Sequence, residues 1–326
     1  MKHVDPQGNS GGPIAGPFRS STTRHLTSTK GQMGARNDGA HTGTTLTNSR
    51  RKQLTQRADV DALSERLSER DWAILRSVAE HQFLTVRHIE AIHFADHPPA
   101  TGGRLARRAL ARLRRLRLLG AINRRVGGVR GGSSGMTHYV DVVGRQLIDG
   151  RSGRHLRGFR EPSQRFVNHR LAVAETHVQL IAADRQKDFE LVMCAVEPQS
   201  WRRYVGLGGA RLTLKADLYA ETATTADSDF VNPWFIEVDL GTEHIPTLLK
   251  KCRDYEAYRR SGTEQADGDG FPLVIWSMTH PDPFRAEQRR TAFRDAIDRD
   301  PQVPNALFRI VAPNQLTALL QKGGDL

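Results

Sequence analysis

Residues 101–120 read TGGRLARRALARLRRLRLLG and decide how the first half of the chain is expected to fold. At helical spacing the apolar residues form one stripe, with Ala106 and Leu110 beside it: Leu105, Ala109, Leu113, Leu116 and Leu119. Arginines cover the opposite side of this helix. Gly120 is expected to end it, because glycine accepts the left-handed conformation that closes many helices. A helix with one apolar and one cationic face suits phosphates or anionic lipid. A basic surface helix without a partner is the alternative.

Charge is distributed unevenly along the 326 residues, whose net charge is +12. Ten arginines and no acidic residue occur between Asp96 and Asp141. Residues 61–160 carry 19 Lys and Arg against 9 Asp and Glu, whereas residues 161–326 carry 20 against 24. A basic first half and a mildly acidic second half predict a DNA-binding part followed by a domain with a different role.

The composition argues against a membrane-spanning or disulfide-stabilised protein. No apolar run approaches the roughly 20 residues that a spanning helix needs, and the N-terminus lacks the apolar core of a signal peptide. Cys194 and Cys252 match no disulfide or metal pattern. Four histidines lack further ligands at recognisable metal spacing and are expected to be ordinary: His81, His88, His93 and His97. We therefore expect a cytoplasmic protein with no membrane partner.

The first half divides into two expected segments. Residues 1–62 have few large apolar side chains and predict a disordered basic arm. Residues 63–149 are expected to form a winged helix-turn-helix. Ser68 with Asp71 resembles a capping signature for its first helix, and Thr85 is the expected N-cap of its second. The arginine-rich helix is the third, which in this architecture enters the major groove of DNA.

A hairpin is predicted after the third helix. The segments AINRRV and MTHYVDVV flank a glycine-rich loop, as the strands of a wing would. Arginines of the third helix and the wing are the candidate DNA-binding residues: Arg104, Arg107, Arg108, Arg112, Arg114, Arg115, Arg124, Arg125 and Arg130. A three-helix bundle with a hairpin that binds protein instead of DNA is the alternative.

The second half predicts a mixed α/β domain. Residues 150–164 have the composition of a linker, and residues 165–326 form the domain. Helices are expected over residues 166–184, 243–260 and 286–299. Strands are expected over residues 189–196, 212–221, 233–240 and 271–278. The overall expectation is an α+β chain with a winged helix-turn-helix followed by this α/β domain.

Two carboxylates lie within apolar strand segments of the second domain. Asp217 follows Leu214 and Ala216, and Glu237 stands between Ile236 and Val238. Because an unpaired buried carboxylate is costly, each must reach a polar edge or be compensated. Two acids on adjacent strands between two helices resemble the PD-(D/E)xK, or restriction-endonuclease-like, fold. This resemblance implies that Asp217 and Glu237 are ligands of Mg²⁺ or Mn²⁺, which would activate water for attack on a phosphodiester.

The sequence departs from the PD-(D/E)xK pattern at the lysine. Asp239 stands two residues after Glu237, where the pattern has lysine, and Lys251 on the following helix is the nearest substitute together with Lys215. The catalytic candidates are therefore Asp217, Glu237, Asp239 and Lys251, with Glu175 as an auxiliary acid. A site that binds without cutting is one alternative. In another interpretation, Asp239 ends a strand and Thr242 is the N-cap of the next helix.

Longer segments resemble the replication-relaxation family of actinobacterial plasmids and mobile elements. They are LSERDWAILRSVAEHQFLTVRHIEAIHF (67–94), RRALARLRRLRLL (107–119), NHRLAVAETHVQL (168–180), FIEVDLGTE (235–243) and KCRDYEAY (251–258). The resemblance covers roughly residues 66–300 and implies a role in plasmid replication or DNA relaxation. It supplies no catalytic residues.

The leading functional hypothesis is a DNA-binding protein for replication, relaxation or mobilisation of a plasmid or integrated element. Its partners would be double-stranded DNA and other replication or transfer proteins, and a homodimer is left open. A metal-dependent DNA endonuclease or nickase is the first alternative. A winged-helix transcriptional regulator, whose second domain serves assembly, is the second.

Overall fold

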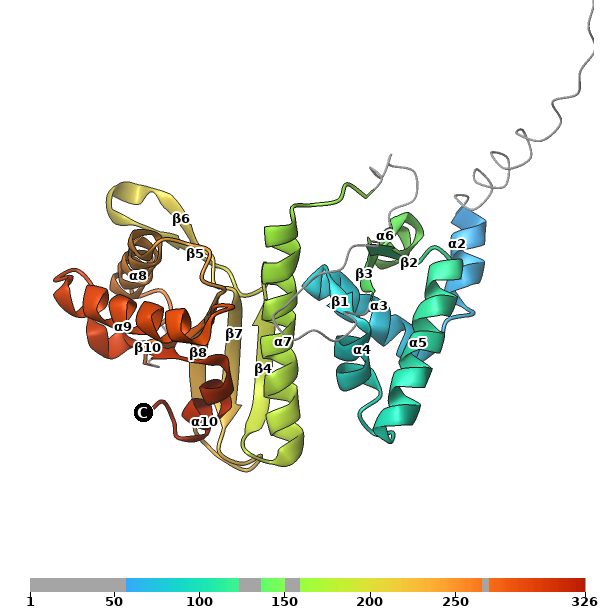
Figure 1. The fold of residues 1–326 in the computed structure, drawn as a ribbon. Helices are drawn as coiled ribbons and strands as arrows, with labels where there is room; N and C mark the ends of the chain where they lie inside the picture. Colours follow the sequence, from blue (N-terminus) through green and yellow to red (C-terminus); the bar gives the residue numbers. More distant parts are fainter. Residues whose placement is uncertain (1–56, 123–135, 150–158, 266–269, 326) are drawn as a thin grey trace, which may run out of the picture. The chain divides into compact units, whose positions relative to one another are not determined.

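The first part of the fold consists of helices around a small antiparallel sheet (Figure 1). The computed structural model describes residues 57–122, 136–149, 159–265 and 270–325. The helices are α2 (Arg57–Ser64), α3 (Glu69–His81), α4 (Val86–His93), α5 (Pro99–Arg115) and α6 (Val142–Asp149). The strands β1 (Leu84–Thr85), β2 (Leu119–Ile122) and β3 (Thr137–Val140) pair in the order β1-β3-β2. The helices α3, α4 and α5 followed by the paired strands β2 and β3 have the predicted order, whereas the short strand β1 between α3 and α4 was not predicted.

Side-chain caps begin α3 and α4 where the sequence places them. The Ser68 side chain accepts a hydrogen bond from the Asp71 backbone N–H, and the Asp71 carboxylate accepts one from Ser68 N at 3.0 Å. Thr85 caps α4 in the same way through the His88 backbone N–H. These bonds satisfy amide groups that the first turn of a helix leaves without partners. Both predicted N-caps are confirmed.

The end of α5 differs from the prediction. The helix ends at Arg115, and Arg117, rather than Gly120, adopts the left-handed conformation with φ 58°. Gly120 lies in β2 opposite Tyr139. A Cβ at this position would stand 2.2 Å from Cζ of Tyr139, so the aromatic ring occupies the space that a side chain would need. Glycine is required here for strand packing rather than for helix closure.

Two other expectations for this part are corrected. The helix α2 begins at Arg57, within the segment expected to be a disordered arm. The helix α6 begins at Val142, where the sequence predicted that the second wing strand continues. The predicted tip of the wing lies in residues 123–135, outside the described residues.

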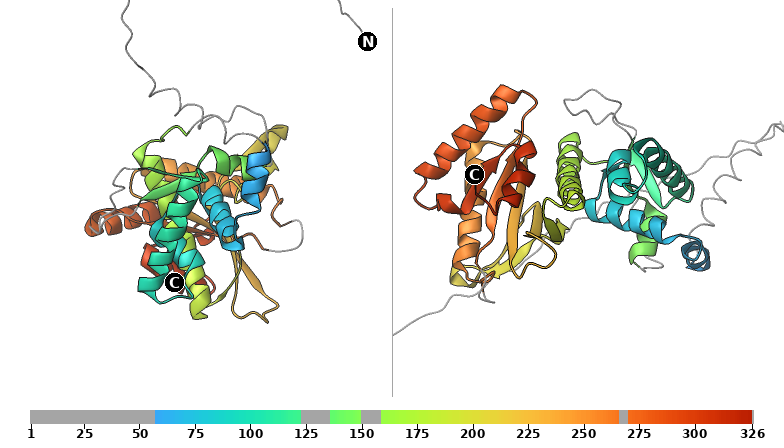
Figure 2. Two further views of the ribbon diagram at one scale, coloured as in Figure 1. Left: turned by 90° about the vertical axis from the view of Figure 1, so that its right-hand side faces the viewer. Right: turned by 90° about the horizontal axis from the view of Figure 1, so that it is seen from below.

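The second part is a five-stranded mixed sheet with helices on both faces, as two further views show (Figure 2). The strand order is β10-β9-β8-β7-β4, for β4 (Glu190–Val196), β7 (Leu218–Ala223), β8 (Val231–Asp239), β9 (Leu273–Met278) and β10 (Phe308–Val311). The pairs β4–β7 and β7–β8 are antiparallel, whereas β8–β9 and β9–β10 are parallel. The helices α7 (Gln164–Gln186) and α10 (Leu316–Gln321) pack on one face; α8 (Ile245–Arg260) and α9 (Pro283–Arg299) pack on the other. The chain is therefore a mixed α+β protein.

The sequence missed several boundaries in this part. The strand predicted over residues 212–221 is two strands, because β6 (Arg211–Leu214) pairs with β5 (Arg202–Val205) in a separate hairpin. Asp217 consequently lies before β7 and not within a strand. The N-cap of α8 is His244 rather than Thr242. The elements β5, β10 and α10 were not predicted.

Helix α7 packs against both parts of the fold. Its residues Val173 and Leu180 join the core beneath the sheet, whereas Ala174 joins the core of α3, α4 and α5. Arg170 is 1% exposed and donates to His81 O at 3.3 Å and to Glu197 O at 3.3 Å. It also binds the Glu197 carboxylate. The end of α3 and the loop after β4 thus share one buried guanidinium.

Two stacked histidines lie beside Arg170. The Nδ1 atom of His81 donates to Ser77 O at 2.9 Å, since a carbonyl only accepts. Its Nε2 atom therefore accepts from Nδ1 of His177 at 2.9 Å. Burial lowers the pKa of His81 to about 3 and that of His177 to about 4. Both rings are neutral in the folded protein at neutral pH.

This pair predicts a loss of stability in acid. The unfolded chain protonates histidine near pH 6.5, whereas the folded protein resists protonation of this pair until about pH 4. The free energy of unfolding should therefore fall as pH decreases from about 6.5 to about 4, by up to about 1.4 kcal/mol per pH unit for each histidine. Urea unfolding at several pH values measures this slope. The double variant His81→Gln/His177→Gln should have a shallower slope, and an unchanged slope would contradict the assignment.

Candidate functional site

The arginine-rich helix α5 is held against α4 by close backbone contact. A Cβ on Gly102 would stand 3.0 Å from Phe94 O, and one on Gly103 would stand 3.0 Å from the Glu90 carboxylate. Ala106, Leu110 and Leu113 are buried in the core of this part. The packing fixes which face of α5 is covered and leaves the opposite face exposed.

The arginines of α5 divide into two groups. Four are exposed: Arg104, Arg107, Arg108 and Arg115. By contrast, Arg112 pairs with the buried carboxylate of Asp71, and Arg114 donates to Sδ of Met136 at 3.0 Å. Arg112 therefore ties α5 to the cap of α3, although the sequence pattern assigned it to the DNA-binding set. Three other members of that set lie outside the described residues: Arg124, Arg125 and Arg130.

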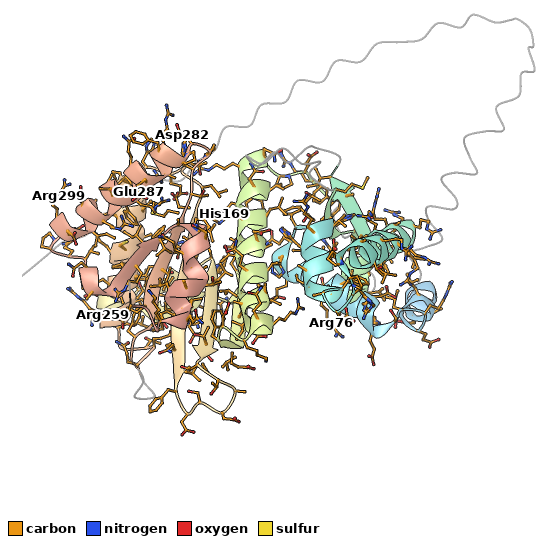
Figure 3. All side chains as sticks on the ribbon, turned by 60° about the horizontal axis from the view of Figure 1, so that its bottom comes forward. Arg76, His169, Arg259, Asp282, Glu287 and Arg299 are labelled. Carbon is orange, nitrogen blue, oxygen red and sulfur yellow. The ribbon has the colours of Figure 1, made fainter. Side chains whose placement is uncertain are left out.

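Asp217 and Glu237, the acid pair, lie at the same end of the sheet, between α7 and α8. His169 lies on α7 (Figure 3), and its Nε2 atom donates a hydrogen bond to Oδ1 of Asp217 at 3.2 Å. Its Oδ2 atom accepts from the Val238 backbone N–H at 2.8 Å. Glu237 is 1% exposed and is bound on one oxygen by Lys251 and on the other by the Tyr255 hydroxyl, both from α8.

Lys251 compensates the charge of both acids. Burial raises the pKa of Asp217, but the Lys251 ammonium and the bonds from His169 and Val238 outweigh it and hold that pKa well below its usual range. Burial raises the pKa of Glu237, and the neighbouring Lys251 ammonium opposes this effect. Burial lowers the pKa of Lys251, but the negative charges of Glu237 and Asp217 raise it above its usual value. Two groups of opposite charge, the Lys251 ammonium and the Asp217 carboxylate, therefore act on Glu237.

Lys251 from α8 reaches the acid pair. Lys215, the other candidate substitute, lies over the Trp201 ring, 4.9 Å from its centroid. Lys250, the neighbour of Lys251 on α8, pairs with Asp254 on the surface at 3.0 Å. Asp239, in the place of the pattern's lysine, is bound by Arg289 through two hydrogen bonds of 2.6 and 3.0 Å. Arg289 thus occupies both oxygens of the Asp239 carboxylate.

Two polar residues of α7, Glu175 and His169, differ from the sequence-based expectation in whether they contact the acid pair. Glu175 does not reach the acid pair, because it accepts a hydrogen bond from Nε2 of His88 on α4 at 3.1 Å. His169 does reach it, although no sequence argument identified it. The pKa of His169 is lowered by burial but raised more strongly by Asp217. Its spacing of one helical turn from Val173, which packs on the sheet, was the available signal.

The acid pair fits a divalent cation in donor chemistry. Carboxylate oxygens are the ligands that Mg²⁺ and Mn²⁺ prefer, and the acid pair supplies them from Asp217, the residue before β7, and from Glu237 near the end of β8. Lys251 now binds one Glu237 oxygen, so a cation at that oxygen would replace the ammonium. Among the residues that the structure describes, no group of three or more His, Cys, Asp or Glu side chains is arranged to hold a metal.

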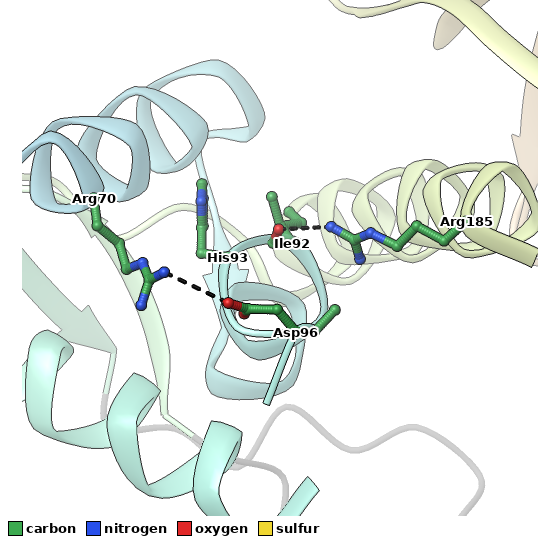
Figure 4. A pocket seen from close by; sticks show the side chains of 6 residues that line it. Arg70, Ile92, His93, Asp96 and Arg185 are labelled. Carbon is green, nitrogen blue, oxygen red and sulfur yellow. Dashed lines mark hydrogen bonds and ion pairs between the residues drawn. The ribbon is translucent and has the colours of Figure 1, made fainter. Parts of the chain in front are cut away.

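A hollow of about 390 Å³ lies elsewhere, beside α4 (Figure 4). Arg70 and Arg185 line it together with His93 and Asp96. Arg70 faces Asp96 at 3.9 Å, and Arg185 donates to Ile92 O at 2.9 Å, so both guanidinium groups already have partners within the protein. Burial lowers the pKa of His93 to about 4, which keeps that ring neutral. The hollow is therefore a poor site for a phosphate.

Comparison with known proteins identifies the family. The family model described as replication-relaxation matches residues 75–274, more than half of the chain. The chain belongs to the replication-relaxation family. The matched range runs from α3 to β9 and includes α5, α7 and the acid pair. Family membership indicates a role connected with replication or relaxation and confirms the resemblance found in the sequence. No curated protein and no solved structure matches the chain.

Within the described residues of this replication-relaxation protein, no helix is both long and apolar enough to cross a membrane. The longest, α7, carries charged and polar side chains on most of its turns.

The contact between Lys251 and Glu237 predicts a measurable coupling. Lys251→Met should lower the free energy of unfolding by about 3 kcal/mol, because the buried Glu237 carboxyl loses its cation. Lys251→Met/Glu237→Gln should recover part of this loss, since a neutral amide needs no counter-charge. Urea unfolding of the single and double variants gives the coupling energy. The control Lys250→Met, at an exposed pair, should cost less than about 1 kcal/mol. Additive effects of the two changes would contradict the pairing.

Proposed function

We propose that the chain is a DNA-binding protein that acts in replication, relaxation or mobilisation of a plasmid or an integrated element. The observation that carries this proposal is the exposed arginine face of α5, opposite residues buried in its own core. Arginine side chains on one face of a helix suit the phosphate backbone of duplex DNA, and their contacts displace condensed counterions. Family membership supports the same role.

The order and pairing of elements favour a winged helix-turn-helix. In that architecture α5 would be the recognition helix in the major groove, and the β2–β3 hairpin would be the wing. Arg104, Arg107 and Arg108 would contact DNA from the first half of α5. Arg112 would act indirectly, because its guanidinium holds the cap of α3 and so orients α5 against α3.

Neutralising the exposed arginines should weaken DNA binding. The variant Arg104→Gln/Arg107→Gln/Arg108→Gln should bind a duplex of about three helical turns at least about tenfold more weakly, and its salt dependence should fall by about 0.9 in log–log slope per lost phosphate contact. Fluorescence anisotropy at several salt concentrations measures both quantities. A matched control removes three exposed cations from other elements: Lys187→Gln/Arg285→Gln/Lys322→Gln. Equal affinity and slope in the two variants would contradict the role of α5.

A second candidate function is metal-dependent DNA cleavage, and the position of Lys251 favours it. Helix α7 precedes the acid pair and α8 follows it, with the β5–β6 hairpin inserted between β4 and β7; this order resembles the restriction-endonuclease-like pattern, and Lys251 supplies an ammonium beside the acid pair from α8. Asp217 and Glu237 would hold Mg²⁺ or Mn²⁺, and the metal would supply an activated water for attack on a phosphodiester. Lys251 would place positive charge beside the reacting phosphate. His169 and the Val238 N–H would orient Asp217.

Cleavage is tested with supercoiled plasmid and purified full-length protein in Mg²⁺ or Mn²⁺. Nicking or linearisation is expected, and it should fall by at least about 100-fold in Asp217→Asn, Glu237→Gln and Lys251→Met, which remove metal ligands or the ammonium. The control Asp254→Asn changes a surface carboxylate on α8 and should cleave normally. Calorimetric titration with Mn²⁺ measures metal binding independently of cleavage. Intact plasmid with either metal would reject the nuclease and leave the DNA-binding proposal standing.

A further inference from the structure

A two-stranded ribbon, β5–β6, projects from the second part of the fold (Figure 1). Its register pairs Arg203 with Thr213 and Val205 with Arg211, so these four side chains share one face. On the other face, Tyr204 and Leu214 are buried in the core with residues of α8. One face of the ribbon is thereby anchored, and the other is exposed to solvent.

The exposed face is cationic. Arg203, Arg211 and Lys215 are exposed, and residues 202–215 contain no Asp or Glu. Among the described residues, none of these three cations is paired with a carboxylate, whereas Arg202 on the anchored face binds Glu264 at 3.1 Å. The second half of the chain carries more acidic than basic residues, 24 against 20. The ribbon is therefore a local concentration of positive charge within an acidic domain.

Shape and apolar exposure at the ribbon suit a groove of DNA. Val205, on the cationic face, is 62% exposed, and Leu212, which pairs with Tyr204 on the other face, is 42% exposed. Gly208 and Gly209 adopt positive φ in this turn, which keeps it narrow. A hollow of about 240 Å³ on the ribbon is lined by Arg203 and Arg211, two of its three arginines. A two-stranded ribbon fits the major groove in width, and arginine binds phosphate through its planar guanidinium.

The base of the ribbon is fixed beside the acid pair. The strand β6 leads through Lys215 and Ala216 directly to Asp217. The Ser200 hydroxyl donates to Ala216 O at 2.6 Å and joins the two strands at their base. The Asp217 carbonyl in turn accepts from Glu197 N at 3.2 Å. The base of the ribbon is thus joined directly to the end of the sheet where Asp217 and Glu237 lie.

We propose that the β5–β6 ribbon is a second DNA-contacting element, which binds the phosphate backbone of the same duplex through Arg203, Arg211 and Lys215. This inference rests on the proposed DNA-binding function and extends it from α5 to the second part of the fold. It gives that part a direct role in binding DNA, with or without cleavage at the acid pair.

The test compares three charge-matched variants of the full-length protein on a fluorescent duplex of about three helical turns. The ribbon variant is Arg203→Gln/Arg211→Gln/Lys215→Gln, the helix variant is Arg104→Gln/Arg107→Gln/Arg108→Gln, and the control is Lys187→Gln/Arg285→Gln/Lys322→Gln. Anisotropy against salt concentration gives the affinity and the log–log slope. Hydroxyl-radical footprinting of the wild-type protein and the ribbon variant shows which stretch of backbone each one protects.

The ribbon variant should bind about tenfold more weakly than the control and lose about 2 in salt slope, as expected for two or three lost phosphate contacts. Its footprint should lose protection at one end and keep the part assigned to α5. If the ribbon and control variants have equal affinity, salt slope and footprint while the helix variant binds weakly, the ribbon does not contact DNA. That outcome would reject this inference and preserve the proposed function. Absence of wild-type binding to duplex DNA would overturn both.

Discussion

Arg170 is the buried group on which the arrangement of the structure depends. Its guanidinium binds the carbonyl of His81, at the end of α3, and both the carbonyl and the carboxylate of Glu197, after β4. A buried cation that loses its partners costs about 3–5 kcal/mol, so these contacts are strongly coupled. Glu197 donates its backbone N–H to the Asp217 carbonyl, which continues the connection to the acid pair. Helix α7 therefore supports the arginine-rich part and the sheet with the same turns.

The charged side chains of this chain occur in two environments, exposed on the surface or buried beside a partner. On α5 and the β5–β6 ribbon, cations are exposed on a face opposite buried apolar side chains, which leaves them available to an external anion. At the sheet, Glu237 and Asp239 each have a cation from a helix, Lys251 and Arg289, and Asp217 is bound by His169 of α7. Exposed cations need no internal partner because water solvates them, whereas a buried carboxylate does. This difference separates the surfaces that are free to contact an external anion from the groups that stabilise the fold or form the acid pair.

The acid pair can serve stability and chemistry at once. Lys251 stabilises Glu237 in the folded protein, and the same ammonium would lie beside a phosphate bound there. His169 and the Val238 N–H fix the orientation of Asp217, as a structural carboxylate or a ligand would each require. Asp239 is fully engaged by Arg289, which favours a structural role for the residue that replaces the pattern's lysine. A reaction at this end of the sheet would therefore involve Asp217, Glu237 and Lys251.

Local sequence determined the features that depend on neighbouring residues. Side chains within one or two helical turns determine the caps at Ser68 and Thr85, the buried face of α5 and the helix α7. The sequence pattern therefore predicted these features. Pairing between distant segments decided the rest. The register of β5 with β6 split a predicted strand, the Tyr139 ring placed Gly120 in a strand, and His169 and Arg289 reached acids far away in sequence. Such contacts join residues that no spacing along the chain relates, and therefore only the tertiary structure specified them.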